Sequence, residues 1–367
     1  FARSGSETAK ILINRNNKVI LNDSKEEEKH DSLKIKELRD LGVEFVFGSH
    51  PDDLLDDSFD YLIKNPGVPI DHKYVLKARE LGIEVINEVE MAYRLIDKDI
   101  KIVSITGTNG KTTTAFIVKD ILAEFGIESG LIGTVKNMVG EKEFHTELTT
   151  PDPYDMHKLF KMMADDGIKH CVMETSSQAF HQMRLAGIHF KVGVFTNLTQ
   201  DHLDYHGTIE EYKACKKTLF LNSENIILNS DDEASQYMGE GVEGNITSYG
   251  VNCEADFKAE NVELFADRVE YDLNNLRVVF NIPGDFSVYN SLSAISAVCS
   301  LGYELSEVVE AISTANAVKG RIELLKTNTD FSVIIDYAHT PDGLEKAIEA
   351  AYAQDLDLVN ISPNAQP

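Results

Sequence analysis

The segment from Ser104 to Thr114, SITGTNGKTTT, constrains this chain more than any other. It follows the apolar pair Ile102-Val103, which is typical of a buried strand, and leads into Thr113–Phe125, where apolar residues recur at helical spacing. A strand, a glycine turn and a helix in this order direct backbone N–H groups and the positive end of a helix dipole at one place, as a bound phosphate requires. Lys111 adds a cation and Thr112 a hydroxyl that suits Mg²⁺. The segment therefore predicts nucleotide binding.

This phosphate loop is a shortened variant. Only two residues separate Gly107 from Gly110, where the standard pattern has four, and Ile105 stands where the earlier glycine would be. The alternative is a glycine-rich turn without a ligand, but that interpretation leaves the Lys-Thr pair at its end unexplained.

The composition is typical of a globular protein of two or three domains, with 367 residues, 43% hydrophobic and 26% charged. The net charge of -26 disfavours nucleic acid and anionic membranes as partners, because both need basic surfaces. Without an apolar run of membrane-spanning length or a leader, we expect neither membrane insertion nor secretion. The four scattered cysteines form no CxxC pair, which favours reduced thiols in a cytoplasmic protein.

Short apolar runs that alternate with helical patterns predict an α/β protein in three parts. We expect residues 1–98 to form a small doubly wound N-terminal domain and residues 99–318 to form a central α/β domain of the P-loop ATPase type. Residues 319–367 are expected to begin a third α/β domain. That domain is interpreted as truncated, because about 45 residues cannot bury both faces of a sheet.

Loops in the first domain are candidate binding sites, since doubly wound sheets bind ligands at the carboxyl ends of their strands. Phe1–Ser6 is interpreted as the loop after a strand outside the sequence, and two further loops follow predicted strands. Plain connections are an equally good interpretation. The candidate residues are Ser4, Asp23, Asn65 and Gly67.

Glu174 ends the apolar run Val172-Met173 and precedes Thr175-Ser-Ser177. An acidic residue at a strand end near a phosphate loop suits Mg²⁺ coordination. The alternative is a role in capping the next helix.

A second polar segment follows the predicted strand Val192–Phe195. It carries four ionisable residues close together, namely Asp201, His202, Asp204 and His206. That density indicates a metal site or an acid–base site, with a polar loop of helix caps as the alternative.

Lys216 is unusual because the helix predicted over Glu210–Phe220 places it on the inward side with Tyr212 and Leu219. An inward lysine must be neutralised, paired or modified.

Three weaker features stand closer to the C-terminus. Asn290 is expected in the first turn of a helix, where its amide suits either a nucleobase edge or a capping role. Arg321 suits a phosphate, and Asp336 at a strand end suits ribose hydroxyls.

Taken together, these motifs resemble the Mur ligase family, the ATP-dependent amide-forming enzymes of peptidoglycan synthesis. Over about residues 100–345, the likeness is strongest to the ligase that adds a diamino acid to UDP-N-acetylmuramoyl-L-alanyl-D-glutamate. The matching strings are Thr106-Gly-Thr-Asn-Gly-Lys-Thr-Thr113, Thr149-Thr-Pro-Asp-Pro153, Met173-Glu-Thr-Ser-Ser177, Asp201-His-Leu-Asp-Tyr-His-Gly207, Gly320-Arg321 and Asp336-Tyr-Ala-His-Thr-Pro-Asp342.

The first 98 residues look like a different member of the family, the D-glutamate-adding ligase. The strings that carry this likeness are Gly48-Ser-His-Pro51, Leu62-Ile-Lys-Asn-Pro-Gly-Val-Pro69 and Glu88-Val-Glu-Met-Ala92. The change near Asp99 to Lys101 is interpreted as a join between two ligase types, whether natural, engineered or misassembled.

The resemblance implies ATP as a substrate, two Mg²⁺ sites and a CO₂-derived carbamate on Lys216. It assigns catalysis to Lys111, Glu174, His202 and Lys216. Thr112 and Glu174 would hold one Mg²⁺, and His202 with the carbamate the other. ATP contacts would come from Gly107, Thr108, Asn109, Gly110, Lys111, Thr112, Thr113, Asn290, Arg321, Asp336 and His339.

The same resemblance assigns the muramoyl dipeptide to Thr149, Thr150, Ser176, Gln182 and Arg184, and the UDP group to the first domain. Gln178 stands where the family usually has histidine, and we expect a modest effect from this difference.

The implied reaction joins a UDP-N-acetylmuramoyl peptide to an amino acid through an acyl phosphate. The pocket for the amine lies mostly in the third domain of the family, so we expect this chain to bind nucleotide and to ligate poorly. The alternatives are D-glutamate addition to UDP-N-acetylmuramoyl-L-alanine, folylpolyglutamate synthesis, and a non-catalytic nucleotide-binding fragment. The choice between L-lysine and meso-diaminopimelate, and the oligomeric state, stay open at this stage.

Overall fold

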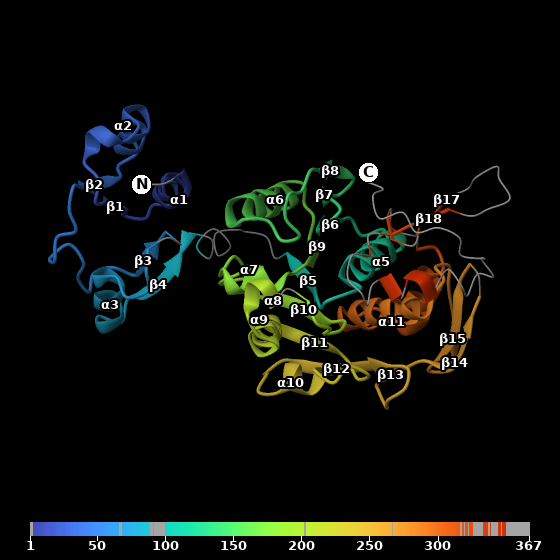
Figure 1. Cartoon of the computed structure of the whole chain (residues 1–367). Helices are drawn as coiled ribbons and strands as arrows, with labels where there is room; N and C mark the ends of the chain where they lie inside the picture. Colours follow the sequence, from blue (N-terminus) through green and yellow to red (C-terminus); the bar gives the residue numbers. More distant parts are fainter. Residues whose placement is uncertain are drawn as a thin grey trace. The chain divides into compact units, whose positions relative to one another are not determined.

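The computed structural model describes residues 3–65, 68–88, 91, 100–201, 203–265, 267–315, 318, 320–321, 323–325, 333–336, 338, 344–345 and 347–349. The chain forms two compact units (Figure 1). The first comprises residues 1–97 with the short segments 153–158 and 185–188, and the second comprises residues 98–152, 159–184 and 189–367.

The first unit alternates short helices with parallel strand pairs. β1 pairs with β2, and β3 with β4, both in parallel. The elements are α1 (Arg3–Asn14), β1 (Ile20–Asp23), a 3-10 turn (Glu27–Lys29), α2 (Ser32–Asp40), β2 (Glu44–Phe47), β3 (Tyr61–Lys64), α3 (Lys73–Glu80) and β4 (Glu84–Asn87).

Helix α1 corrects the prediction that Phe1–Ser6 is a loop, because its first turn already begins at Arg3. The helix forms because Ala9 and Ile13, four residues apart, share a face that packs in a core with Leu38 and Val43. Ser4 therefore lies in a helix, and the structure does not describe its side chain.

The second unit is organised on a nine-stranded sheet in the order β13-β12-β11-β10-β5-β9-β6-β7-β8. Neighbours from β13 to β6 are parallel, and β6, β7 and β8 pair in antiparallel fashion. The strands are β5 (Lys101–Thr106), β6 (Ser129–Ile132), β7 (Asn137–Val139), β8 (Lys142–Phe144), β9 (His170–Glu174), β10 (Phe190–Phe195), β11 (Ser223–Asn229), β12 (Asn245–Gly250) and β13 (Phe257–Lys258).

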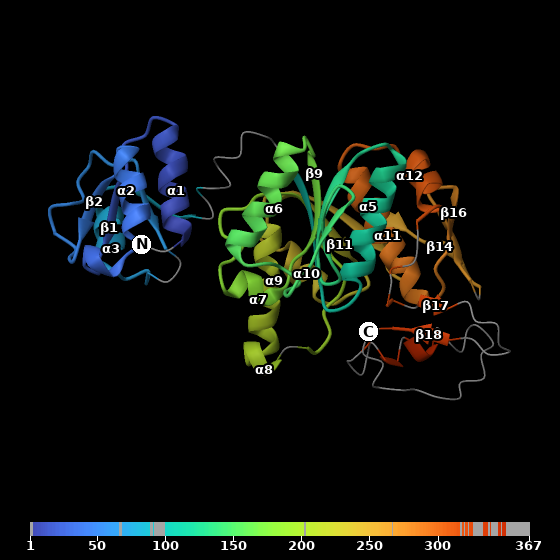
Figure 2. The same cartoon turned by 90° about the horizontal axis from the view of Figure 1, so that it is seen from above.

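Helices cover both faces of this sheet, as Figure 2 shows, with α5, α11 and α12 on one side and α7 and α9 on the other. The strand β5 is buried along most of its length because both of its faces are covered. The helices are α5 (Lys111–Glu124), α6 (Pro153–Asp165), α7 (Ser177–His181), α8 (Leu203–His206), α9 (Ile209–Leu221), α10 (Ser235–Gly239), α11 (Asp285–Ser300) and α12 (Leu305–Ile312).

The β-rich stretch predicted between Ser248 and Ile282 also contains an antiparallel three-stranded sheet, β14 (Glu260–Leu264), β15 (Val269–Leu273) and β16 (Leu276–Phe280). Beyond it, β17 (Glu323–Leu325) pairs with β18 (Val333–Ile335). His339 and most of the helix predicted over residues 342–351 lie outside the described residues. None of the described helices combines the length and the apolar character that crossing a bilayer requires.

Candidate functional site

The phosphate loop lies between β5 and α5, at the carboxyl end of a central strand. Gly110 is the N-cap of α5 with φ of 82°, a conformation that glycine adopts without strain. A Cβ atom there would lie 2.5 Å from Oδ1 of Asn290, and one at Gly107 would collide with Thr196. Both glycines are therefore required by close packing around the loop.

The loop after β10 holds the phosphate loop in place. The backbone N–H of Thr108 donates to the carbonyl of Asn197 at 2.9 Å, and that of Asn109 donates to Asn197 Oδ1 at 2.8 Å. The N–H of Leu198 donates to Asp232 Oδ2 at 2.7 Å, which ties this bracing loop to the segment that follows β11. The phosphate loop is thus braced by hydrogen bonds from the protein itself.

Two lysine side chains meet at this loop. Lys111 Nζ donates to the carbonyls of Gly107 and Thr108 at 2.9 and 2.8 Å, and Lys216 Nζ donates to the same Gly107 carbonyl at 2.7 Å. Lys216 is 1% exposed and packs over the ring of Tyr212. The inward face predicted for Lys216 is confirmed.

The ionisation of both lysines is shifted by this enclosure. Burial, reinforced by the nearby Lys111 cation, holds the pKa of Lys216 well below its ordinary value. Burial also lowers the pKa of Lys111, although the carboxylate of Glu174 opposes the shift. Burial raises the pKa of Tyr212 to about 12. The site therefore makes the charged form of Lys216 costly.

Glu174 lies at the end of β9, the neighbour of β5, and is 1% exposed. Its Oε2 accepts hydrogen bonds from Thr112 Oγ1 at 2.8 Å and Thr134 Oγ1 at 3.0 Å, and its Oε1 accepts one from the Thr134 N–H at 2.8 Å. Ser176, not Glu174, caps α7. The capping alternative for Glu174 is therefore wrong.

A cavity of about 490 Å³ joins the phosphate loop to a second group of polar residues. Most of the predicted site residues of the second unit line it. They are Gly107, Thr108, Asn109, Gly110, Lys111, Thr112, Thr113, Thr149, Thr150, Glu174, Ser176, Gln182, Arg184, Lys216 and Arg321.

One wall of this cavity is built around Thr150. Its hydroxyl donates to the Glu174 carbonyl at 3.0 Å and accepts from the Ser176 N–H at 3.0 Å, while Arg184 Nη1 donates to its carbonyl at 2.6 Å. Arg184 Nε also donates to Gln182 Oε1 at 2.8 Å. The wall is thus a connected hydrogen-bond network that includes the Arg184 guanidinium.

Of the four ionisable residues in the segment after β10, the three that the structure describes lie in different environments. Asp201 lines the cavity, Asp204 is exposed on α8, and His206 is buried against Ser177. His202 lies outside the described residues. Among the residues that the structure describes, no three His, Cys, Asp or Glu side chains converge as a metal site.

Two further predictions need adjustment. Asn290 lies in the second turn of α11, not the first, because that helix begins at Asp285 after Gly284, whose φ is 95°. Asp336 directly follows β18 and accepts the N–H of Ala338, and it does not line the cavity. Sequence reasoning missed Thr134, although its position two residues after β6 is a strand-end signal.

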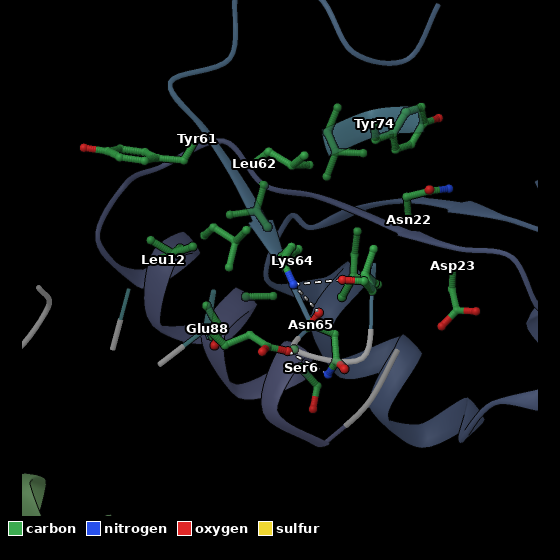
Figure 3. A pocket seen from close by; sticks show the side chains of 18 of the residues that line it. Ser6, Leu12, Asn22, Asp23, Tyr61, Leu62, Lys64, Asn65, Tyr74 and Glu88 are labelled. Atoms are coloured by element: carbon green, nitrogen blue, oxygen red, sulfur yellow. Dashed lines mark hydrogen bonds between the residues drawn. The ribbon is translucent and has the colours of Figure 1, made fainter. Parts of the chain in front are cut away.

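The first unit has a cavity of its own, of about 1020 Å³. Asp23 and Asn65 line it, and Figure 3 shows Asn65, Glu88 and Ser6 gathered in one part of it. Asn65 Nδ2 donates to the buried Glu88 carboxylate at 3.0 Å, and Lys64 Nζ donates to the Val68 carbonyl at 2.8 Å. Gly67 lies outside the described residues. Sequence reasoning missed Lys64 and Glu88.

Comparisons with known proteins give the following matches. Residues 105–298 match the model of the Mur ligase middle domain. A protein of Clostridium acetobutylicum, named UDP-N-acetylmuramoyl-L-alanyl-D-glutamate-2,6-diaminopimelate ligase 1, is 43% identical over 258 residues, which are 69% of this chain and 54% of that protein. The ligase of that name from Clostridium botulinum is 42% identical over 260 residues, with the same coverage of 69% and 54%. The chain thus spans about half the length of the curated relatives it matches.

Solved structures show the same fold. One titled as a UDP-N-acetylmuramoyl-L-alanyl-D-glutamate-2,6-diaminopimelate ligase gives a TM-score of 0.66 at 22% identity, over 83% of this chain and 73% of that one. A pseudomurein peptide ligase type C from Methanothermus fervidus gives 0.56 at 22% identity, over 100% and 76%. At these identities the likeness concerns the fold alone.

Proposed function

This chain belongs to the Mur ligase family, and on that premise we propose that it is an ATP-dependent ligase of peptidoglycan precursor synthesis. The reaction adds a diamino acid, L-lysine or meso-diaminopimelate, to UDP-N-acetylmuramoyl-L-alanyl-D-glutamate. The observation that carries the proposal is the single cavity in which the phosphate loop, the Thr112–Glu174 pair and the Thr150–Arg184 wall meet.

ATP binds with its terminal phosphates over the phosphate loop and the N-terminus of α5 in this proposal. Lys111 leaves the carbonyls of Gly107 and Thr108 and turns its cation to the transferring phosphoryl group, where it stabilises the developing negative charge. Arg321, whose Nη2 lies 3.5 Å from Thr112 Oγ1, is placed to neutralise the same phosphates.

The oxygens of Thr112 and Glu174 fit a magnesium ion. They are hard ligands, buried and 2.8 Å apart, and Mg²⁺ in phosphoryl-transfer sites takes one or two such protein oxygens beside phosphate and water. When bound, Mg²⁺ supplies charge stabilisation at the phosphoryl oxygens. A second ion would be held by His202 and a carbamate on Lys216.

Lys216 has the environment that carbamate formation needs. Carbamate forms when a neutral amine attacks CO₂ and releases a proton, which leaves an N-carboxylate. Burial lowers the pKa of Lys216, which raises the share of the neutral amine that this step needs. The product is an anion, so it attracts the Lys111 cation.

The acceptor peptide lies against Thr149, Thr150, Ser176, Gln182 and Arg184 in this proposal. Its carboxylate attacks the γ-phosphate and forms an acyl phosphate and ADP. The amine of the diamino acid then attacks the acyl carbon through a tetrahedral intermediate and expels phosphate. The UDP group binds in the cavity of the first unit, where Asp23 and Asn65 are candidate contacts.

A panel of assays tests this function. Phosphate release is measured with two acceptors, UDP-N-acetylmuramoyl-L-alanine and its D-glutamyl extension, each combined with D-glutamate, L-lysine or meso-diaminopimelate. We expect release above background only with the D-glutamyl acceptor and a diamino acid. Release only with the shorter acceptor and D-glutamate would establish the alternative that the first 98 residues favour. Mg·ATP binding without release in any arm would establish the non-catalytic alternative.

A further inference from the structure

Helix α8 contacts the wall of the cavity that is built around Thr150 and α7, where the proposed acceptor binds, and its described side chains do not line the cavity. We call this wall the acceptor wall. The wall includes α7 and its cap, which contribute Ser176, Ser177, Gln178 and Gln182 to the lining. Neither Tyr205 nor His206 of α8 lines the cavity. Both contact α7 from behind, so α8 is in a position to fix where the wall lies.

His206 contacts the first turn of α7. It is 4% exposed, and its Nε2 lies 2.8 Å from the hydroxyl of Ser177. That hydroxyl also donates to Gln178 Oε1 at 3.3 Å, so it accepts from an Nε2–H group on His206. With the proton on Nε2, the other ring nitrogen accepts from the Cys215 thiol on α9 at 3.9 Å. A single tautomer thus links α9, α8 and α7.

Tyr205 contacts the other end of α7. Gln182 Nε2 donates to its hydroxyl at 2.9 Å, and that hydroxyl lies 3.0 Å from Nδ1 of His181. Two consecutive residues of α8 therefore hold the two ends of one short helix. Tyr205 is 40% exposed, so water competes with its hydrogen bonds more than with those of His206.

The turn between α8 and α9 makes this arrangement possible. Gly207 has φ of 76°, so the chain reverses there without the strain that a side chain would introduce. Thr208 then caps α9 by accepting the N–H of Glu211 at 3.2 Å. The ring of His206 lies 5.3 Å from that of Tyr212 on α9, whose hydroxyl lies 3.2 Å from Thr108 Oγ1 of the phosphate loop.

We propose that α8 is a clamp that fixes the position of α7, and so of the acceptor wall, relative to α9, which carries Lys216. His206 is its main positioning residue and Tyr205 a weaker one. This inference rests on the proposed function, because it takes the α7 wall as the place where the acceptor binds. His206 acts through Ser177 and does not touch the acceptor itself. Its loss therefore weakens acceptor binding and leaves the phosphate loop, which has its own brace at Asn197, intact.

The test is calorimetry on the whole chain with two ligands in separate titrations. One is UDP-N-acetylmuramoyl-L-alanyl-D-glutamate and the other is the magnesium complex of β,γ-methylene-ATP. His206→Phe keeps a ring but loses the donor, and we expect about tenfold weaker acceptor binding with nucleotide affinity within about twofold, since one buried hydrogen bond is lost. His206→Gln retains an N–H donor at the position of Nε2, and we expect it to recover most of the loss.

Ser177→Ala and Tyr205→Phe remove one oxygen each and serve where the His206 variant fails to fold. We expect Ser177→Ala to match His206→Phe and the double variant to be no worse than either one, because both remove the same hydrogen bond. Tyr205→Phe should cost about twofold to threefold. The exposed His189, replaced by glutamine, is the matched control and should change neither affinity.

Equal loss of both affinities in His206→Phe, or no rescue by His206→Gln, would overturn the inference, because each outcome marks a general structural role. Unchanged acceptor affinity in Ser177→Ala would overturn it as well. If the unsubstituted chain itself fails to bind the acceptor, the proposed function fails first. Acceptor binding by the unsubstituted chain and by His206→Phe alike would overturn the clamp alone.

Discussion

Lys111 and Lys216 donate to the same oxygen atom, the carbonyl of Gly107, at 2.9 and 2.7 Å. Two ammonium groups on one carbonyl repel each other, and burial adds to the cost of keeping both charged. Any group that turns Lys216 neutral or negative, or draws Lys111 toward a phosphate, relieves this repulsion. The relationship explains why stability, modification and nucleotide binding should be coupled at this site.

Replacement of Lys216 by methionine should stabilise the unmodified chain. The substitution keeps the length of the side chain and removes an amine that must either stay charged while buried or give up its proton on folding, and both cost free energy. We therefore expect a gain of about 1 kcal/mol or more in the free energy of unfolding near pH 7. Nucleotide affinity should persist, whereas ligation should fall to background because no carbamate can form. Urea unfolding under CO₂-free conditions, together with phosphate release, checks both expectations.

The increase in the free energy of unfolding that we expect from Lys216→Met should depend on pH. The folded-state pKa of Lys216 lies well below its ordinary value, so the unfolded chain binds more protons at pH values between the two. The stability of the unsubstituted chain therefore rises with pH through that window, and the advantage of Lys216→Met shrinks. Lys213→Met is the control for the loss of a lysine from the same helix. A constant difference from pH 7 to about 10 would contradict the assignment.

Replacement of Lys111 by alanine should weaken Mg·ATP binding by about tenfold to a hundredfold, because hydrogen bonds between a cation and phosphate are lost. Lys119 provides a control on the same helix, since it is buried and donates to the carbonyls of Ser129 and Gly140. We expect Lys119→Met to lower stability without changing nucleotide affinity. Calorimetry with Mg·ATP that finds the two variants equal would rule out the assigned role of Lys111.

Sequence reasoning reached the parts of this site that depend on local periodicity. The inward face of Lys216 follows from helical spacing alone, and Glu174 was identified because it ends an apolar strand. The contact of Glu174 with Thr134 could not be predicted, because it depends on β6 lying beside β9 in a sheet whose strand order the sequence does not state. Local sequence patterns predict where strands end, but which strand ends lie side by side depends on the sheet topology.

The differences have similarly specific causes. Asp204 and His206 lie two residues apart on a helical turn, so their side chains diverge, while the metal or acid–base site that also involves His202 stays a prediction. The helix α1 was missed because its stabilising contacts, from Ala9 to Leu38 and Val43, are tertiary. Asn290 was placed one turn too early because Gly284-Asp285 gives no clear start signal without its φ angle.

Replacement of Glu174 by glutamine should remove the effect of magnesium on nucleotide affinity. The amide can keep one acceptor for the Thr134 N–H, so the fold should persist, but it lacks the charge that Mg²⁺ prefers. Titration of the ATP analogue with and without Mg²⁺ should show enhancement in the unsubstituted chain and almost none in Glu174→Gln. Glu147 also lines the cavity and is exposed, so Glu147→Gln is the matched control and should retain the enhancement. Full retention in Glu174→Gln would place the ion elsewhere.

Asp232 should matter for nucleotide binding although it does not line the cavity. Its Oδ2 accepts the Leu198 N–H at 2.7 Å and its Oδ1 accepts the Ala234 N–H at 2.8 Å, so it anchors the loop that holds Thr108 and Asn109. Asp232→Ala leaves the bracing loop without this anchor, and we expect about threefold to tenfold weaker Mg·ATP binding.

The adjacent Glu233 is exposed, and Glu233→Ala should bind Mg·ATP as the unsubstituted chain does. Asp232→Asn keeps one carboxamide oxygen, so it should accept the Leu198 N–H and lose less affinity than the alanine variant. Equal affinities for the asparagine and alanine variants would mean that the negative charge of Asp232, and not its hydrogen bond to the bracing loop, acts on the nucleotide. That result would also show that the phosphate loop keeps its shape without the hydrogen bond from Leu198 to Asp232, and the Asn229 amide, which donates to the Thr196 carbonyl at 2.8 Å, would then be the next contact to test.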